Sequence, residues 1–182
     1  MKFLFTFCIA FAIVSTNVFG QITESPIKVG DPSPVFSLPD LQNNYVFLRD
    51  YSGEKLRKPW KNKTKYVIVM SFFATWCAPC KKEIPYLTKL KNYFTGKPVK
   101  FYLVDVGEEK QKVKAFVVKN KIELPILFDQ YQVVSDKYGA NSLPRLVVID
   151  KNGKIKKYEK GFDNPETFIA EMKDLISELL EG

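Results

Sequence analysis

The sequence around two closely spaced cysteines, from Tyr66 to Leu90, reads YVIVMSFFATWCAPCKKEIPYLTKL. Its first part, residues 66–73, is an apolar run rich in β-branched and aromatic side chains, with Ser71 as its one small polar residue, which is typical of a strand buried on both faces. From Pro79 onward, apolar residues recur at helical spacing, at Ile84, Leu87, Leu90 and Phe94. The pattern therefore predicts a buried strand that turns directly into a helix, with Cys77 at the N-terminus of that helix.

Cys77 and Cys80 form a Cys-x-x-Cys pair. A disulfide across two intervening residues closes a very small loop, so it constrains the unfolded chain little and contributes little stability. Half of a zinc site is also disfavoured, because four ligands are needed and the chain has neither a second Cys pair nor any His. At a helix N-terminus, backbone N–H groups and the helix dipole favour an anion and lower a thiol pKa. We therefore interpret Cys77 as an attacking thiolate and the more shielded Cys80 as the cysteine that resolves a mixed disulfide.

The composition of the whole chain limits its chemistry. It has 182 residues with 28 Lys and Arg, 20 Asp and Glu, three Cys and no His, a length that fits one domain of ordinary size. Without His there can be no Ser-His or Cys-His catalytic pair and no His-ligated zinc or haem iron. We predict no metal and no cofactor. Any chemistry must come from Cys, carboxylates, Lys, Tyr or the backbone.

The first twenty residues have the layout of a secretory signal peptide, with Lys2 as their only charge and an apolar run from Phe3 to Val14. This run is shorter than the ~20 residues that a membrane-spanning helix needs. We expect residues 1–20 to be a signal peptide, with an uncleaved anchor as the alternative, and residues 21–182 to form the domain in the periplasm or cell envelope. The third cysteine, Cys8, lies in this segment, so cleavage leaves only Cys77 and Cys80. Outside the cytoplasm, these two are expected to be a disulfide or a redox couple.

Beyond the cysteines, predicted strands and helices alternate. Residues 101–106 and 126–128 are expected to be strands with a helix between them, and residues 145–149 and 154–158 to form a hairpin through Asn152-Gly153, a strong turn signal. A last helix follows Asn164-Pro165, with apolar residues on one face: Phe168, Ile169, Met172, Leu175, Ile176, Leu179 and Leu180. These elements predict a mixed α/β sheet with helices on both faces.

The segment Phe73–Pro85, FATWCAPCKKEIP, resembles the active-site segment of thioredoxin-fold proteins. It is most similar to the extracytoplasmic, membrane-associated thiol-disulfide reductases, a group that includes the cytochrome c maturation reductases. Residues 29–38 resemble the opening strand of that family, residues 104–108 the end of a central strand, and residues 143–150 the segment that carries a cis-proline. The resemblance implies a thioredoxin-like fold with a central mixed β-sheet flanked by helices and an N-terminal β-hairpin extension.

The resemblance also implies a substrate groove. Pro144 would be cis and face the cysteine pair, so that the backbone beside Leu143 and Pro144 is free to pair with an extended substrate, and Trp76 would shape the groove. The family often has Thr after this proline. This chain has Arg145, which would add a positive rim.

Glu83 follows Cys80 by three residues and so lies on roughly the same helical face. A lone Glu here would be an exposed first-turn carboxylate favoured by the helix dipole. The resemblance instead implies an acidic residue near the active site, whereas thioredoxin has a buried Asp on the preceding strand, where this chain has Ser71. Our hypothesis is that Glu83 raises the cysteine pKa by like-charge repulsion and shuttles a proton. We also expect Glu108 to line this region.

Residues 51–65 contain a cluster of basic residues, Lys55, Arg57, Lys58, Lys61, Lys63 and Lys65. A solvated loop is the simplest interpretation, and contact with an anionic membrane surface or an acidic partner is the alternative. Nucleic acid is not expected as a partner, because the domain is exported and has no nucleic-acid-binding motif.

These observations predict an exported thiol-disulfide oxidoreductase of the protein-disulfide reductase type. The reducing direction is favoured because no His lies between the cysteines, where strongly oxidising relatives commonly have one. The resemblance implies a disulfide-bonded protein substrate, with apocytochrome c among the candidates, and a membrane thiol-electron donor as a second partner. The alternatives are a disulfide-forming oxidase and a non-catalytic thioredoxin-like binding or chaperone module.

Overall fold

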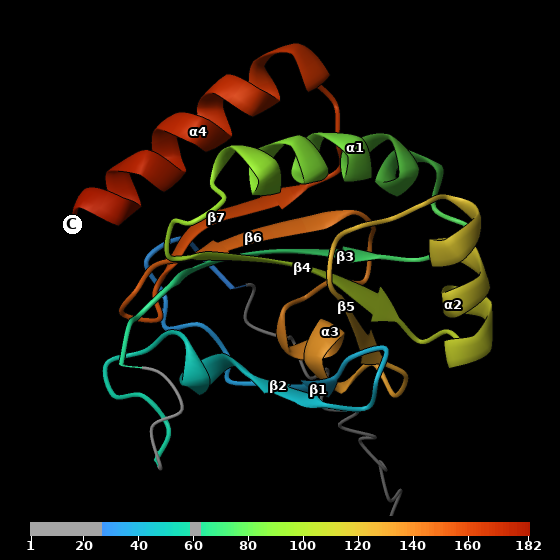
Figure 1. The fold of residues 1–182 in the computed structure, drawn as a ribbon, viewed down its shortest axis with the longest axis horizontal. Helices are drawn as coiled ribbons and strands as arrows, with labels where there is room; N and C mark the ends of the chain where they lie inside the picture. Colours follow the sequence, from blue (N-terminus) through green and yellow to red (C-terminus); the bar gives the residue numbers. More distant parts are fainter. Residues whose placement is uncertain (1–26, 59–62) are drawn as a thin grey trace, which may run out of the picture.

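The computed structural model describes residues 27–58 and 63–182 (Figure 1). It contains a five-stranded sheet with the strand order β5-β4-β3-β6-β7 and a separate two-stranded sheet, β1-β2. The strands of the larger sheet are β3 (Val67–Phe73), β4 (Val99–Val106), β5 (Ile126–Asp129), β6 (Arg145–Ile149) and β7 (Ile155–Lys160). The helices are α1 (Ala78–Tyr93), α2 (Lys110–Lys119), α3 (Val133–Lys137) and α4 (Pro165–Glu181). The predicted signal peptide, residues 1–20, and Lys61 of the basic cluster lie outside the described residues.

Strand β3 runs through the middle of the larger sheet. It pairs in parallel with β4, and β4 pairs in parallel with β5, whereas β6 and β7 are antiparallel to their neighbours. Parallel neighbours need a crossover connection, and α1 provides it between β3 and β4. All seven residues of β3 are buried, as the apolar run predicts. The mixed α/β sheet expected from the sequence is confirmed.

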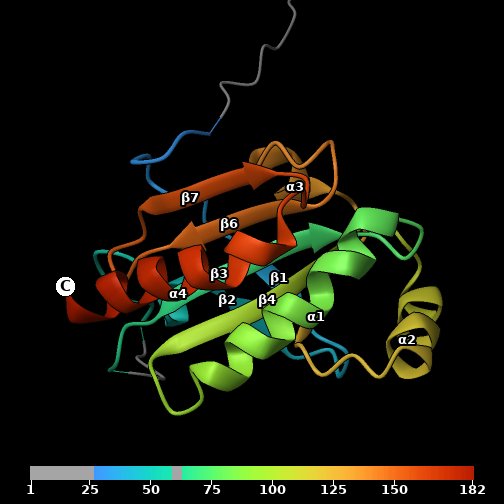
Figure 2. The same cartoon turned by 90° about the horizontal axis from the view of Figure 1, so that it is seen from above.

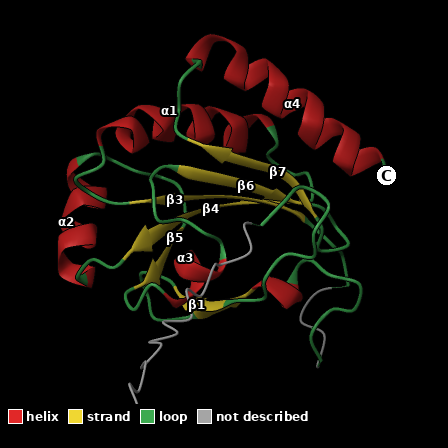
Figure 3. Cartoon of the chain, turned by 180° about the vertical axis from the view of Figure 1, so that it is seen from behind, coloured by secondary structure: helices red, strands yellow, loops and turns green. Residues whose placement is uncertain are grey.

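The two faces of this sheet carry separate hydrophobic cores, because successive side chains of a strand point to opposite faces. On one face, Val69 and Phe73 pack with residues of α1, α2 and α4. Figure 2 shows α1 and α4 lying across this face. On the other face, Met70 and Phe72 pack with Tyr138 and with the N-terminal hairpin, and Figure 3 shows α3 and β1 on this side. Helix α1 and the hairpin therefore lie on opposite faces of the sheet.

The predicted N-terminal β-hairpin is present as β1 (Ser37–Pro39) and β2 (Tyr45–Phe47), which are followed by a short 3-10 helix, η1 (Leu48–Asp50). Strand β1 covers only the end of the segment 29–38 that resembles an opening strand. Pro32 and Pro34 have no N–H group to donate to a neighbouring strand, so they exclude the earlier residues from a regular ladder. A bridge between Asp40 and Leu127 of β5 attaches the hairpin to the larger sheet.

The C-terminal hairpin forms as predicted from β6 and β7, with β7 continuing to Lys160. At its turn, Gly153 has a φ of 84°, and a Cβ atom there would lie 3.0 Å from the Cα atom of Gly53. Both the positive φ and this close approach require glycine. Helix α3 is not predicted by the sequence, because a helix of five residues is too short to show a helical period.

Candidate active site

The cysteine pair lies where β3 ends and α1 begins. Cys77 is the N-cap residue of α1, and its Sγ atom accepts a hydrogen bond of 3.2 Å from the backbone N–H of Cys80. The two cysteines are joined by a disulfide bond. The exposed fraction is 3% for Cys77 and 0% for Cys80, so Cys77 is the more accessible of the two.

The cis-proline lies at the same edge of the sheet as the cysteines. The Leu143-Pro144 peptide bond is cis, as the resemblance implies. Pro144 directly precedes β6, whose first residue, Arg145, pairs with Phe72 near the end of β3. Because β6 is antiparallel to β3, the chain enters β6 at the edge where β3 leads into the cysteine loop. The fold therefore brings the cysteine loop and the cis-proline together.

A groove of about 800 Å³ runs beside this edge. Trp76 and Leu143 both line it, together with residues 106–109, so the structure unites the two predicted groove residues. Trp76 is 67% exposed at this groove.

Arg145 braces the loop before the cis-proline. Its guanidinium lies 4.7 Å from the ring centroid of Tyr158, and it donates a hydrogen bond of 3.2 Å to the hydroxyl of Ser142. Ser142 lines the groove. Arg145, which stands where the family often has Thr, therefore holds a residue of the groove wall in place through this hydrogen bond.

Glu83 is buried, with an exposed fraction of 1%. Its Oε2 atom accepts a hydrogen bond of 2.6 Å from the hydroxyl of Ser71, whereas its Oε1 atom has no hydrogen-bond partner among the described residues. Burial raises the pKa of Glu83 to about 7, although the Ser71 hydrogen bond acts in the opposite direction. The alternative of an exposed first-turn carboxylate is therefore wrong for this chain.

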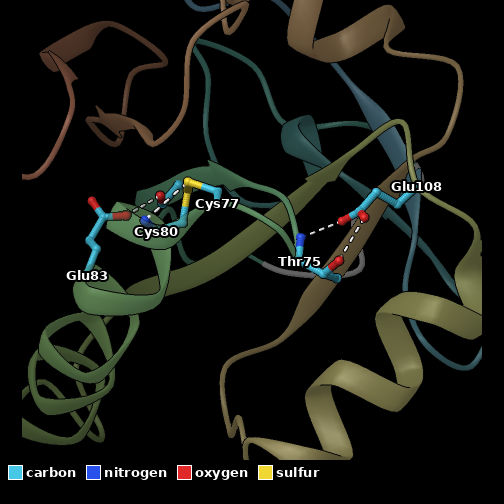
Figure 4. The surroundings of a disulfide bond; sticks show 6 residues. Thr75, Cys77, Cys80, Glu83 and Glu108 are labelled. Atoms are coloured by element: carbon cyan, nitrogen blue, oxygen red, sulfur yellow. Dashed lines mark hydrogen bonds between the residues drawn. A yellow bond between two sulfur atoms is a disulfide. The ribbon is translucent and has the colours of Figure 1, made fainter.

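Glu108 lies on the other side of the disulfide from Glu83 (Figure 4). Its carboxylate accepts hydrogen bonds from the backbone N–H and the hydroxyl of Thr75, the latter at 2.8 Å, and pairs with Lys112 at 2.6 Å. Burial acts to raise the pKa of Glu108, but the hydrogen bonds from Lys112 and Thr75 outweigh it, so the pKa is lowered. Glu108 thus anchors the loop two residues before Cys77 as an ionised group.

Asp105 is a buried carboxylate that the sequence analysis did not single out. It lies on β4 opposite Phe73, and its Oδ2 atom accepts a hydrogen bond of 3.3 Å from the backbone N–H of Glu108. Its exposed fraction is 0%, and its Oδ1 atom has no partner within the described ranges. Burial and the nearby charge of Glu108 raise the pKa of Asp105 to about 8. A charged residue within the apolar strand FYLVDV is the signal that could have identified it.

Among the described residues of the basic cluster in residues 51–65, Arg57 and Lys65 contact other parts of the fold. Arg57 pairs with Asp50 at 2.7 Å and stacks over the ring of Phe47, and Lys65 donates a hydrogen bond to Asn152. Contact of this cluster with a membrane or an acidic partner stays a prediction.

The described residues contain no group of three His, Cys, Asp or Glu side chains arranged to hold a metal ion. In residues 27–58 and 63–182, no helix has both the length and the apolar character needed to cross a bilayer.

A buried strand, a disulfide-linked Cys-x-x-Cys pair at the following helix N-terminus and a cis-proline on the adjoining strand define a thioredoxin-fold redox protein. A family model described as Redoxin matches residues 28–176. The thiol-disulfide oxidoreductase ResA of Geobacillus thermodenitrificans is 33% identical over 148 residues, which cover 81% of this chain and 77% of that protein. ResA of Bacillus subtilis is 30% identical over 150 residues, covering 82% and 76%. The chain belongs to the Redoxin family and is a thiol-disulfide oxidoreductase.

Solved structures agree on the fold. The thioredoxin domain of a thiol-disulfide oxidoreductase from Bacteroides vulgatus superposes with a TM-score of 0.67 at 22% identity, covering 82% of this chain and 99% of that chain. A thiol:disulfide interchange protein from a Bacteroides species also gives a TM-score of 0.67 at 22% identity, covering 83% and 91%. The thioredoxin-like fold predicted from the sequence is confirmed.

Proposed function

We propose that this enzyme reduces disulfide bonds of proteins outside the cytoplasm, with Cys77 as the nucleophile and Cys80 as the resolving cysteine. The observation that carries the proposal is the placement of Cys77 at the N-cap of α1, disulfide-bonded to a fully buried Cys80. The helix N-terminus favours the thiolate form of Cys77, and exposure decides which sulfur a substrate reaches first.

In the proposed reaction, the Cys77 thiolate of the dithiol form attacks one sulfur of a substrate disulfide. A mixed disulfide forms, and the other substrate sulfur leaves as a thiolate that takes up a proton. Cys80 then loses its proton and attacks the Sγ atom of Cys77, which forms the intramolecular disulfide and releases the second substrate thiol. Two electrons pass from the enzyme dithiol to the substrate disulfide, and the enzyme ends in the oxidised form that the structure contains.

Glu83 is proposed to accept the proton that Cys80 loses in the second step. It follows Cys80 by one turn of α1, and its pKa of about 7 allows it to exchange a proton near neutral pH. Its negative charge, when present, also raises the pKa of the cysteines by repulsion. The titrations of Glu83 and the two cysteines are coupled. The two effects are therefore separated only by measuring both the cysteine pKa values and the reaction rates in the same variant.

Trp76, Leu143 and Pro144 are proposed to bind the substrate chain. Trp76 and Leu143 line the groove, and the cis bond at Pro144 supports the interpretation that the neighbouring backbone pairs with an extended segment. Glu108 is proposed to position this site through Thr75 rather than to react.

The cellular setting of the proposal comes from the sequence and the resemblance. Residues 1–20 have the layout of a signal peptide, so we place the domain in the periplasm or cell envelope, anchored if that segment is retained. A membrane thiol-electron donor would restore the dithiol, since an oxidising compartment does not. Apocytochrome c is a candidate substrate, and the basic cluster in residues 51–65 is a candidate contact with the membrane surface.

The test is reduction of a protein disulfide, such as those of insulin, by the wild type and by a Cys77→Ser variant. Turnover that disappears in Cys77→Ser supports the proposal, whereas the absence of any cysteine-dependent turnover in the wild type would indicate a binding or chaperone module. The measured two-electron potential decides the direction, because a value well above that of thioredoxin would favour the disulfide-forming oxidase. A Cys80→Ser variant should trap the substrate as a mixed disulfide and identify it.

A further inference from the structure

A second cavity, of about 650 Å³, lies on the face of the sheet opposite α1 and α4. It lies between the N-terminal hairpin on one side and β5 and α3 on the other and opens to solvent, with Phe36, Leu38, Phe47, Phe128 and Val134 among its lining residues. Its volume falls within the range of about 300–1,000 Å³ that is usual for binding sites. The proposed reaction at the cysteines makes no use of this cavity.

Exposed apolar side chains gather around this cavity. Eight large apolar residues of the described chain are exposed, and four of them line the cavity. They are Val35, Tyr45, Tyr131 and Val133, with exposed fractions of 57%, 60%, 83% and 53%. Apolar side chains scattered singly over a surface need no explanation, but a cluster at the mouth of a cavity indicates a site that another molecule covers.

The charges around the cavity favour an anionic occupant. Arg49, Lys110 and Lys137 line it, and Arg49 and Lys110 donate hydrogen bonds to the backbone carbonyls of Lys55 and Asp40, which are neutral. Their positive charges therefore remain available to a bound molecule.

The other charged groups in the lining have oppositely charged or dipolar partners. Arg57 is paired with Asp50, and Glu108 with Lys112. Asp129 accepts hydrogen bonds from the backbone N–H groups that begin α3. The lining thus combines apolar walls with an excess of positive charge.

The cavity is also adjacent to the groove beside the disulfide. Glu108 lines both, so the short segment around it forms the divide between the two sites. A polypeptide bound in the groove between Trp76 and Leu143 would reach the second cavity once it passes this segment. A small amphipathic anion would fit the cavity alone, but the position of the cavity next to the groove favours a chain that occupies both.

We propose that this cavity is a docking site for a partner polypeptide, which places an apolar side chain between the hairpin and α3 and flanking acidic residues against Arg49, Lys110 and Lys137. The docked segment continues from the segment whose disulfide is reduced at Cys77, so the inference rests on the proposed function and names its substrate class. Substrates of this enzyme are then proteins with an apolar and acidic segment near the disulfide.

The experiment uses peptides with one intramolecular disulfide and a dithiol reductant that regenerates the enzyme. One peptide has no extension, one carries an extension of Leu, Phe, Asp and Glu residues after a glycine spacer, and one carries the same extension with Lys in place of the acidic residues. Spacers of graded length are used at either terminus. The measured quantity is the ratio of kcat/KM for each extended peptide to that for the short peptide.

We expect a ratio of about ten for the acidic extension with the wild type, which corresponds to about 1.4 kcal/mol, and a ratio near one for the Lys extension. In a Tyr131→Ser/Lys137→Glu variant, the acidic-extension ratio should fall to about one. Both side chains are exposed, so this variant is expected to fold. The matched control is Val118→Ser/Lys119→Glu on α2, where both side chains are exposed and outside the cavity, and which should keep the wild-type ratio.

Three results would overturn the docking proposal while leaving the proposed function intact. The first is a kcat/KM ratio near one for every extended peptide with the wild type, and the second is the same acidic-extension ratio in the two double variants. The third is binding of dodecanoate, a small amphipathic anion, in the cavity without any preference of the enzyme for the acidic extension. A change in oligomeric state in the cavity variant without a change in ratio would also overturn it, because a second copy of the chain would then be the occupant. If the wild type turns over none of the peptides, the proposed function itself fails.

Discussion

The hydroxyl of Ser71 donates a hydrogen bond of 2.6 Å to the carboxylate of Glu83, and both side chains are buried. Ser71 is on β3 and Glu83 on α1, so this bond joins the strand and the helix that flank the cysteine loop. It places an ionisable group of pKa about 7 inside the core, one helical turn from Cys80. A buried carboxylate is costly to ionise, so its position affects both stability and chemistry.

The stability of the oxidised protein should fall as the pH rises from about 4.5 to about 7. The pKa of Glu83 is raised from 4.5 to about 7 in the fold, so in this window the folded state binds more protons than the unfolded state. The loss due to Glu83 is about 3 kcal/mol, because each pKa unit corresponds to about 1.4 kcal/mol. A Glu83→Gln variant, which stays neutral, should show a correspondingly smaller loss between pH 5 and pH 8 in urea unfolding. The exposed Glu178→Gln serves as control, and equal pH dependence in all three proteins would contradict this origin.

In the reduced protein, Glu83→Gln should lower the pKa values of the cysteines. Removing a nearby negative charge removes the repulsion that disfavours the thiolate, so the thiolate becomes easier to form. The titration can be followed by the ultraviolet absorbance of the thiolate, with Glu178→Gln as control. Unchanged cysteine pKa values in Glu83→Gln would refute the tuning role, and an unchanged rate of mixed-disulfide resolution would refute the role as proton acceptor.

Local sequence pattern determines the parts of the fold that could be predicted. The strand before Cys77, the helix after it and the turn at Gly153 each depend on residues that are neighbours in the chain, and each is confirmed. The cis bond at Pro144 could not follow from composition, since only ~5% of such bonds are cis, and came from the resemblance.

The burial of carboxylates could not be read from the sequence, because it depends on contacts between distant segments. Glu83 is buried where α1 packs against β3, and there Ser71, twelve residues earlier in the chain, donates a hydrogen bond to its carboxylate. Glu108 meets Thr75 across 33 positions, and Asp105 becomes buried only when β4 pairs with β3. Helix α3 was missed for a different reason, since five residues give too little pattern.

Asp105 should cause a further loss of stability at higher pH than Glu83 does. Its pKa is raised from 3.8 to about 8, so the folded state holds a proton that the unfolded state has lost across this interval, and stability declines until the pH exceeds about 8. Asp105→Asn keeps an oxygen that can accept the hydrogen bond from the Glu108 N–H but cannot ionise. Urea unfolding of this variant between pH 7 and pH 9 should therefore show a flatter profile than the wild type. If its decline over that range matches the wild type, Asp105 does not hold the proton.

The loop that leads to the cis-proline should be sensitive to the contact between Gly139 and Tyr158. Gly139 has a φ of 55°, and a Cβ atom there would lie 2.9 Å from the Tyr158 hydroxyl, which itself donates a hydrogen bond of 2.8 Å to the carbonyl of Tyr138. Gly139→Ala therefore has two costs. The positive φ costs about 1 kcal/mol for a residue with a Cβ atom, and the close contact with the Tyr158 hydroxyl adds to it. Gly96→Ala is the matched control, because Gly96 has a φ of 81° with no heavy atom near the added Cβ.

Tyr158→Phe removes the hydroxyl and should cost about 1 kcal/mol through the lost hydrogen bond. In the double variant, Gly139→Ala should cost less than it does alone, by at least about 0.5 kcal/mol, because the group that it contacts is absent. The quantity to measure is the free energy of unfolding of the two single variants and the double variant, together with kcat/KM for a disulfide peptide. Additive costs would show that Tyr158 does not restrict the backbone at Gly139. A cost for Gly139→Ala no larger than that for Gly96→Ala would lead to the same conclusion, because the positive φ alone would then account for it.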